Sequence, residues 1–294
     1  MTDFHVLDCH HHVADVSGPS GLAGPSVPSE ASGRSGASGA DSGDDRGIAD
    51  DRNTRLATMD RNGVGQAVVI PGHSYLRPNG LTDTRRVNDA IAAYRDAVPD
   101  RFPAAIGVTE PLYGPAGLAE IDRCADELGL RGISIHARFH GVAVGSPLVR
   151  AIIERCGERG LVPFVHAIGE SANEALWQVQ ELGRDFPDLT MVVLDAFSSF
   201  EQCQQALSVG ELAPNLVFDT SLAYTFDLVE PFVRRHGASR LVFGTDLYSP
   251  PLGYRRTHVL GQILDSELPD DDKRQILADN TRRILGLANG GATS

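Results

Sequence analysis

Short apolar runs alternate with amphipathic helical patterns along almost the whole chain, and this alternation is the strongest constraint on its fold. Eight runs are predicted as strands: Phe4–His10, Gln66–Ile70, Phe102–Val108, Gly132–His136, Leu161–His166, Leu189–Leu194, Asn215–Asp219 and Arg240–Gly244. The segments between and after them are predicted as helices: Asp51–Asn62, Thr82–Ala97, Gly114–Leu128, Pro147–Arg159, Ser171–Asp185, Phe200–Val209, Thr225–His236, Tyr254–Leu264 and Asp270–Leu285. Strict alternation indicates a parallel sheet. Eight units in 294 residues predict a closed (β/α)₈ TIM barrel, with an open doubly wound sheet as the alternative.

The barrel is expected to form one domain over residues 1–288. Residues 17–47 interrupt it after the first strand and consist almost entirely of Ser, Gly, Ala, Pro and Asp. Such a segment buries too little apolar surface to order itself. We expect a flexible insertion, with a lid over the site as the alternative, and a disordered tail at 289–294.

Charge and composition narrow the classes of partner. The net charge of −13 argues against nucleic acid and anionic membranes. No apolar stretch approaches the length of a membrane span, and no signal peptide is visible. The four cysteines, Cys9, Cys124, Cys156 and Cys203, form no C-x-x-C pair. We therefore expect reduced thiols and a cytoplasmic protein.

Lysine occurs once, at Lys273, and all other basic residues apart from the histidines are arginine. Schiff-base chemistry thus has almost no candidate nucleophile. A carbamylated lysine bridging two metal ions has no candidate within the strands.

His10 and His12 close the first apolar run. Because strand side chains alternate between faces, Asp8, His10 and His12 are expected to point the same way. Two imidazoles at the end of a strand can hold a metal ion, and they are equally compatible with a polar strand end.

Polar residues also stand where the other predicted strands end, which is where TIM barrels carry their catalytic groups. The set formed by His10, His12, His166 and Asp246 offers three nitrogens and one carboxylate. Such ligands suit one divalent ion, Zn²⁺ first and Mn²⁺ or Fe²⁺ as alternatives. An ion with an open position lowers the pKa of bound water, and Asp246 could then act as the general base.

These residues resemble the amidohydrolase superfamily, in particular its amidohydrolase 2 branch of decarboxylases and lactonases. The similarity rests on Asp8-x-His10-x-His12, His166 and Gly244-Thr245-Asp246. Three further segments agree with that branch: Met59–Val64, Leu130–His136 and Asn280–Leu287. The resemblance implies a small-molecule substrate and a monomer or homodimer.

The chain departs from the family pattern at two strand ends. Ser134 or His136 stands where binuclear relatives carry the carbamylated lysine, which implies a mononuclear site. Asp195 stands where many relatives carry a histidine after strand six. The resemblance implies that, in the decarboxylases, this histidine takes part in activating water or protonating the substrate. Its replacement by Asp195 therefore weakens a decarboxylase interpretation.

The remaining candidates surround the proposed ion. Asp195 is predicted to be a further ligand, a general acid or base, or an orienting partner of a ligand histidine. His136 and Arg138 lie where relatives bind substrate; His136 is a candidate catalytic residue, and the Arg138 guanidinium suits a substrate carboxylate. The predicted lining of the pocket is His73, Tyr75, Ser221 and Tyr248.

The leading hypothesis is a metal-dependent hydrolase that cleaves a C–O or C–N bond of a lactone, ester or amide, with Asp246 as general base. The first alternative is a metal-dependent decarboxylase of a small carboxylic acid. Metal-independent lactone hydrolysis and a non-catalytic binding barrel are the further alternatives.

Overall fold

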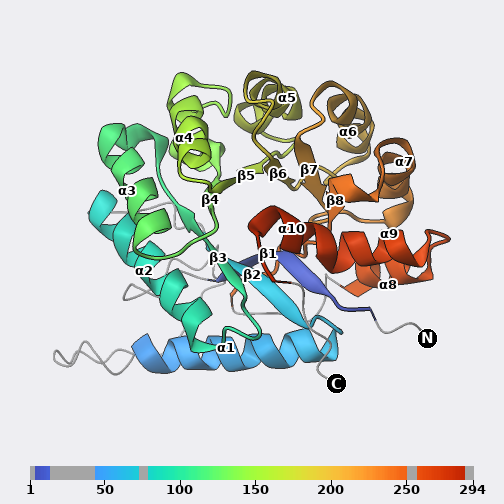
Figure 1. Cartoon of the computed structure of the whole chain (residues 1–294), viewed down its shortest axis with the longest axis horizontal. Helices are drawn as coiled ribbons and strands as arrows, with labels where there is room; N and C mark the ends of the chain where they lie inside the picture. Colours follow the sequence, from blue (N-terminus) through green and yellow to red (C-terminus); the bar gives the residue numbers. More distant parts are fainter. Residues whose placement is uncertain (1–3, 14–43, 73–78, 250–256, 289–294) are drawn as a thin grey trace, which may run out of the picture.

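The computed structural model describes residues 4–13, 44–72, 79–249 and 257–288. Within them, eight parallel strands alternate with helices around a barrel, which confirms the predicted (β/α)₈ fold (Figure 1). The strands follow one another around the sheet in chain order: β1 (Leu7–Val13), β2 (Gln66–Pro71), β3 (Ala104–Val108), β4 (Gly132–Ile135), β5 (Val162–His166), β6 (Met191–Leu194), β7 (Leu216–Asp219) and β8 (Leu241–Val242).

The helices cover the outside of the strands (Figure 1). They are α1 (Asp44–Arg61), α2 (Leu81–Ala97), α3 (Pro115–Asp126), α4 (Pro147–Glu158), α5 (Leu176–Asp185), α6 (Phe200–Leu212), α7 (Phe226–His236), α8 (Thr257–Asp265), α9 (Asp270–Arg274) and α10 (Asn280–Leu285). Helix α1 begins at Asp44, so it includes the last four residues of the predicted insertion. Residues 17–43 and the tail 289–294 lie outside the described residues.

Backbone hydrogen bonds join the first strand to the last and close the barrel. The Cys9 N–H donates to the Phe243 carbonyl at 2.9 Å, and the His12 N–H donates to the Leu247 carbonyl at 2.7 Å. The two donors lie within β1, and the two acceptors follow β8 along the chain. The open-sheet alternative is therefore wrong.

Alternation along the strands divides the core into two layers. One layer lies between strands and helices and includes Val69, Ile135 and Phe218. The other fills the barrel and includes Leu7, Val68 and Phe164. This inner layer also includes Ala278 and Leu285 from the C-terminal helical segment. The Asn280 amide donates to the carbonyls of Ala238 and Leu241, so this segment covers the end of the barrel where β8 begins.

The first strand contains an irregularity that decides which of its side chains face inward. Asp8 pairs with Ala67 whereas His11 pairs with Val69, so β1 has one residue more than β2 over this stretch. Such a bulge reverses the alternation of side chains. The prediction that Asp8 shares a face with the two histidines is therefore wrong: Asp8 accepts hydrogen bonds from the Thr245 backbone N–H and hydroxyl and lies 3.1 Å from His11 Nε2.

The pairing also places the end of β1 later than predicted. The ladder with β2 continues through His12 and Val13, so the strand runs to Val13 and does not stop at His10.

Among the described residues, no helix is both long enough and apolar enough to cross a membrane.

Candidate metal centre

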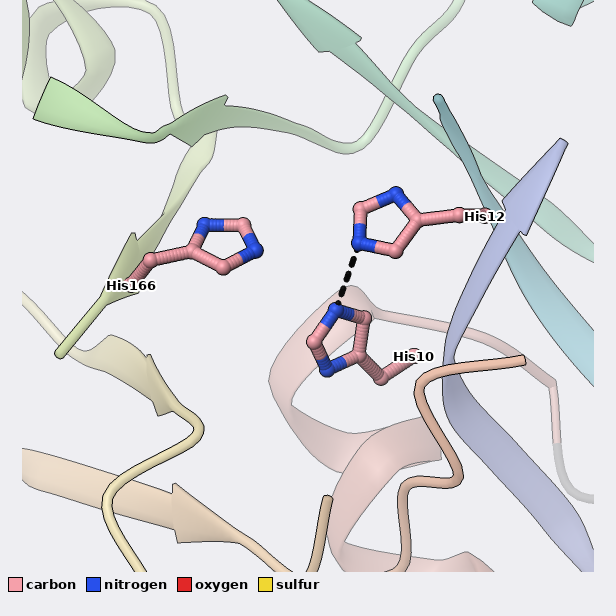
Figure 2. Close-up of side chains that lie close together, drawn as sticks. All are labelled: His10, His12 and His166. Atoms are coloured by element: carbon pink, nitrogen blue, oxygen red, sulfur yellow. Dashed lines mark hydrogen bonds between the residues drawn. The ribbon is translucent and has the colours of Figure 1, made fainter. Parts of the chain in front are cut away.

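Three histidines and a carboxylate converge where β1, β5 and β8 end. His10 and His12 come from β1 and His166 from the last position of β5, and all three are buried (Figure 2). Their candidate ligand atoms all lie within 4.8 Å of one another. Asp246 follows β8, and its Oδ1 lies 3.5 Å from the Nε2 atoms of both His10 and His12.

The outer nitrogen of each histidine is held by an oxygen atom. His10 Nδ1 lies 2.8 Å from Asp219 Oδ2, while His12 Nδ1 and His166 Nδ1 each lie 3.1 Å from a backbone carbonyl, of Pro71 and Ile135 respectively. Carbonyl and carboxylate oxygens accept, so each Nδ1 carries a proton and donates it. The Nε2 lone pairs are consequently turned toward the centre of the cluster, as in known metal sites.

The contact between the two β1 histidines requires positive charge. Their Nε2 atoms are 2.8 Å apart (Figure 2), and both Nδ1 atoms already carry hydrogens. Either an additional proton or a cation must therefore lie between them. Burial opposes charge on His10, but its hydrogen bond to Asp219 and the negative charges of Asp219, Asp246 and Asp195 outweigh it and raise the pKa of His10 to about 10. Burial and the nearby His10 lower the pKa of His12 well below its usual value. This donor set fits one divalent ion in place of that proton.

Asp195 lies beside this cluster, immediately after β6. Its carboxylate, His10 and Asp246 offer ligand atoms within 4.8 Å of one another. The backbone of Asp195 has a positive φ of 66°, a conformation that Asp and Asn tolerate better than most side chains. Burial raises the pKa of Asp195 to about 6, while His10 opposes the rise.

A second group lies on the β4 and β5 side of the cluster. The His136 ring stacks on His166 with centroids 4.0 Å apart, and its Nδ1 lies 2.5 Å from Glu174 Oε1. The same Glu174 oxygen accepts the backbone N–H of Arg138 at 3.1 Å. Burial raises the pKa of Glu174 to about 7. Burial and the Arg138 charge lower the pKa of His136.

The structure locates the predicted lining residues as follows. The Tyr248 ring lies 4.4 Å from the His12 ring and is 40% exposed, so it borders the mouth of the site. The Ser221 hydroxyl is buried against Asp195 and Asp219, which favours a supporting position over direct contact with substrate. His73 and Tyr75 lie outside the described residues.

The sequence predicts no role for two supporting carboxylates, Asp219 and Glu174. Asp219 is the polar residue that ends β7, but its partner His10 is 209 positions away in the sequence. Glu174 precedes α5 in a segment without a motif and reaches His136 across 38 positions. Only the closed barrel brings these pairs together.

The amidohydrolase family model matches residues 7–287, so the chain belongs to the amidohydrolase family of enzymes and the predicted resemblance is confirmed. A curated relative is 2-amino-3-carboxymuconate-6-semialdehyde decarboxylase of Dictyostelium discoideum, 24% identical over 281 residues that cover 81% of this chain and 77% of the relative.

Solved structures show the same fold. A 5-carboxyvanillate decarboxylase of Novosphingobium aromaticivorans with manganese is 16% identical, with a TM-score of 0.70 and coverage of 97% of this chain and 96% of that one. A dihydroxybenzoic acid decarboxylase of Polaromonas with bound manganese is 14% identical, with a TM-score of 0.69 and 98% coverage of both chains. These relatives favour the decarboxylase alternative over the predicted hydrolase.

Proposed function

We propose that this protein is a metal-dependent, non-oxidative decarboxylase of a small unsaturated or aromatic carboxylic acid. The observation that carries the metal-dependent part is the convergence of three Nε2 lone pairs and the Asp246 carboxylate. His10, His12, His166 and Asp246 would hold the ion. The manganese bound by two of the related decarboxylases supports Mn²⁺, with Zn²⁺, the ion predicted first, as the alternative. When bound, such an ion supplies a Lewis acid that binds substrate oxygen atoms and stabilises developing negative charge.

Decarboxylation of this kind exchanges a carboxylate for hydrogen. The bond between carbon and carboxylate breaks, CO₂ leaves, and the electron pair left on carbon takes up one proton. Asp195 is the proposed proton donor, because it lies beside the ligands and burial raises its pKa to about 6, which keeps part of the population protonated near neutral pH. Asp195 is reprotonated from solvent in each turnover.

Two residues at the mouth support an acidic, planar substrate. The Arg138 side chain is partly exposed, and its positive charge acts on Asp195. A guanidinium there can pair with a carboxylate of the substrate. The exposed ring of Tyr248 offers a flat face beside His12. The relatives are named as decarboxylases of 2-amino-3-carboxymuconate-6-semialdehyde and of 5-carboxyvanillate, which supports the same substrate class.

Hydrolysis is the second candidate, and Asp195 is the observation that favours it. A carboxylate occupies the position where the family resemblance predicts a histidine after β6. In that reaction Asp246 takes a proton from water, and a lactone, ester or amide is cleaved.

The test is an assay of chelator-treated protein reloaded with Mn²⁺ or Zn²⁺. We expect CO₂ release from members of a panel of hydroxybenzoates and unsaturated diacids, and its loss without metal. His166→Asn should abolish the activity, whereas the control His5→Asn, at the opposite end of the barrel, should keep it. Cleavage of lactones or esters without CO₂ release from any acid would overturn the proposal in favour of hydrolysis.

A further inference from the structure

The carboxylate of Asp219 contacts both the candidate metal ligand His10 and Asp195, with one oxygen toward each. We infer that Asp219 is a positioning residue that sets both the tautomer of His10 and the placement of Asp195. One buried side chain then governs metal affinity and the position of the proton donor together. The donor role of Asp195 rests on the proposed function, whereas the two contacts of Asp219 do not.

The first contact fixes His10. Asp219 Oδ2 lies 2.8 Å from His10 Nδ1, and both side chains are fully buried. An ionised carboxylate only accepts, so it keeps the proton on Nδ1 and the lone pair on Nε2. Gly244 confirms how closely this pair is packed: a Cβ atom there would lie 2.7 Å from Asp219 Oδ2 and 3.0 Å from His10 Cβ.

The second contact holds Asp195. Asp219 Oδ1 accepts the backbone N–H of Asp195 at 3.0 Å and lies 2.6 Å from the Ser221 hydroxyl. That hydroxyl in turn lies 2.8 Å from Asp195 Oδ1. Asp195 has a backbone conformation rare for residues other than glycine, and such conformations persist only where surrounding contacts determine them. Asp219 and Ser221 provide those contacts.

Asp219 differs from the other partners of the histidine cluster. His12 and His166 donate to backbone carbonyls, which no substitution removes. His10 alone of these three donates its Nδ1 hydrogen to a side chain. The tautomer of His10 is therefore the one that a single substitution can reverse.

The test is Asp219→Asn, which preserves size but presents an NH₂ group on one side. With the amide oxygen toward the Asp195 N–H, the NH₂ group faces His10 and forces Nδ1 to accept, so Nε2 gains the hydrogen. The dissociation constant for Mn²⁺, measured by competition with a fluorescent chelator, should rise about 10- to 100-fold. The ¹⁵N spectrum of labelled histidine in the Zn²⁺-loaded protein should show the His10 proton on Nδ1 in the wild type and on Nε2 in the variant.

Two further variants separate the contacts. Ser221→Ala keeps the bond to His10, so the affinity for Mn²⁺ should stay within about threefold while the Asp195 amide exchanges faster with solvent. Glu120 is a buried carboxylate that pairs with Arg123 in the outer helical layer. Glu120→Gln is therefore the control for the loss of a buried charge, and it should leave both readouts unchanged.

An affinity of Asp219→Asn within threefold of the wild type would overturn the inference. If that variant does not fold, a His10 proton found on Nε2 in the wild-type protein would overturn it instead. Neither readout requires turnover. Weak metal binding by Asp219→Asn in a protein that decarboxylates no acid would reject the proposed function and support this inference.

Discussion

The ring of His136 lies parallel to that of His166, with 3° between the planes and 4.0 Å between the centroids. A residue outside the proposed ligand set thus packs directly on a candidate ligand and is itself held by Glu174. The position of the His166 ring depends on this stack as well as on its own bond to the Ile135 carbonyl.

The His136–Glu174 pair predicts a specific dependence of stability on pH. The raised pKa of Glu174, about 7 against 4.5, alone would give stability that is lost as pH rises toward 7. The lowered pKa of His136 alone would give stability that is lost as pH falls below 6.5. Between pH 4.5 and 6.5 the two residues change the unfolding free energy with pH in opposite directions, and the changes cancel. The reason is that the pair holds one proton in both the folded and the unfolded chain.

Glu174→Gln should remove this compensation. Compared with the wild type, the variant should lose up to about 1.4 kcal/mol of unfolding free energy per pH unit below pH 6.5. Urea denaturation of the metal-free proteins at several pH values measures the difference. The double variant His136→Gln/Glu174→Gln should lose the added slope, and an equal slope in wild type and Glu174→Gln would contradict this account.

Gly244→Ala should damage the metal centre through packing alone. Its new Cβ atom would meet Asp219 Oδ2 at 2.7 Å and force Asp219 and His10 apart. Overpacking of this kind costs about 1–3 kcal/mol of unfolding free energy, and affinity for the metal should fall with it. The matched control is Gly261→Ala in α8, where a Cβ atom meets nothing within 4 Å and stability should stay equal or rise. Equal effects of the two substitutions in thermal unfolding would show that the site is not tightly packed.

Asp195→Asn should slow CO₂ release without releasing metal. Asn tolerates the positive φ of this residue, so the backbone should be preserved, while the acidic proton is lost. We expect kcat to fall about 10²- to 10⁴-fold, with metal content unchanged by elemental analysis. Asp195→His restores the residue predicted by the family resemblance and should retain more decarboxylation than Asp195→Asn. If Asp195→Asn keeps the wild-type kcat, Asp195 is not the proton donor.

The sequence predicts the order of the eight strands and the polar residues at their ends, because alternation and strand termination are local properties. The ligand set His10, His12, His166 and Asp246 could be proposed on that basis. The bulge in β1 could not be predicted, since it is defined by pairing with β2, and it removes Asp8 from the group. Asp219 meets its partner His10 only in the folded barrel, where β7 pairs with β8 and the chain after β8 bonds to β1. The sequence around Asp219 therefore does not reveal this contact.

The central claim is that one divalent ion is held between His10, His12, His166 and Asp246. Crystals of the wild-type protein soaked in Mn²⁺, with diffraction data collected at the manganese absorption edge, test it most directly. We predict one anomalous peak per chain about 2.0–2.3 Å from Nε2 of each histidine and from an Asp246 oxygen. A peak elsewhere, or none at this position in fully soaked crystals, would contradict the account.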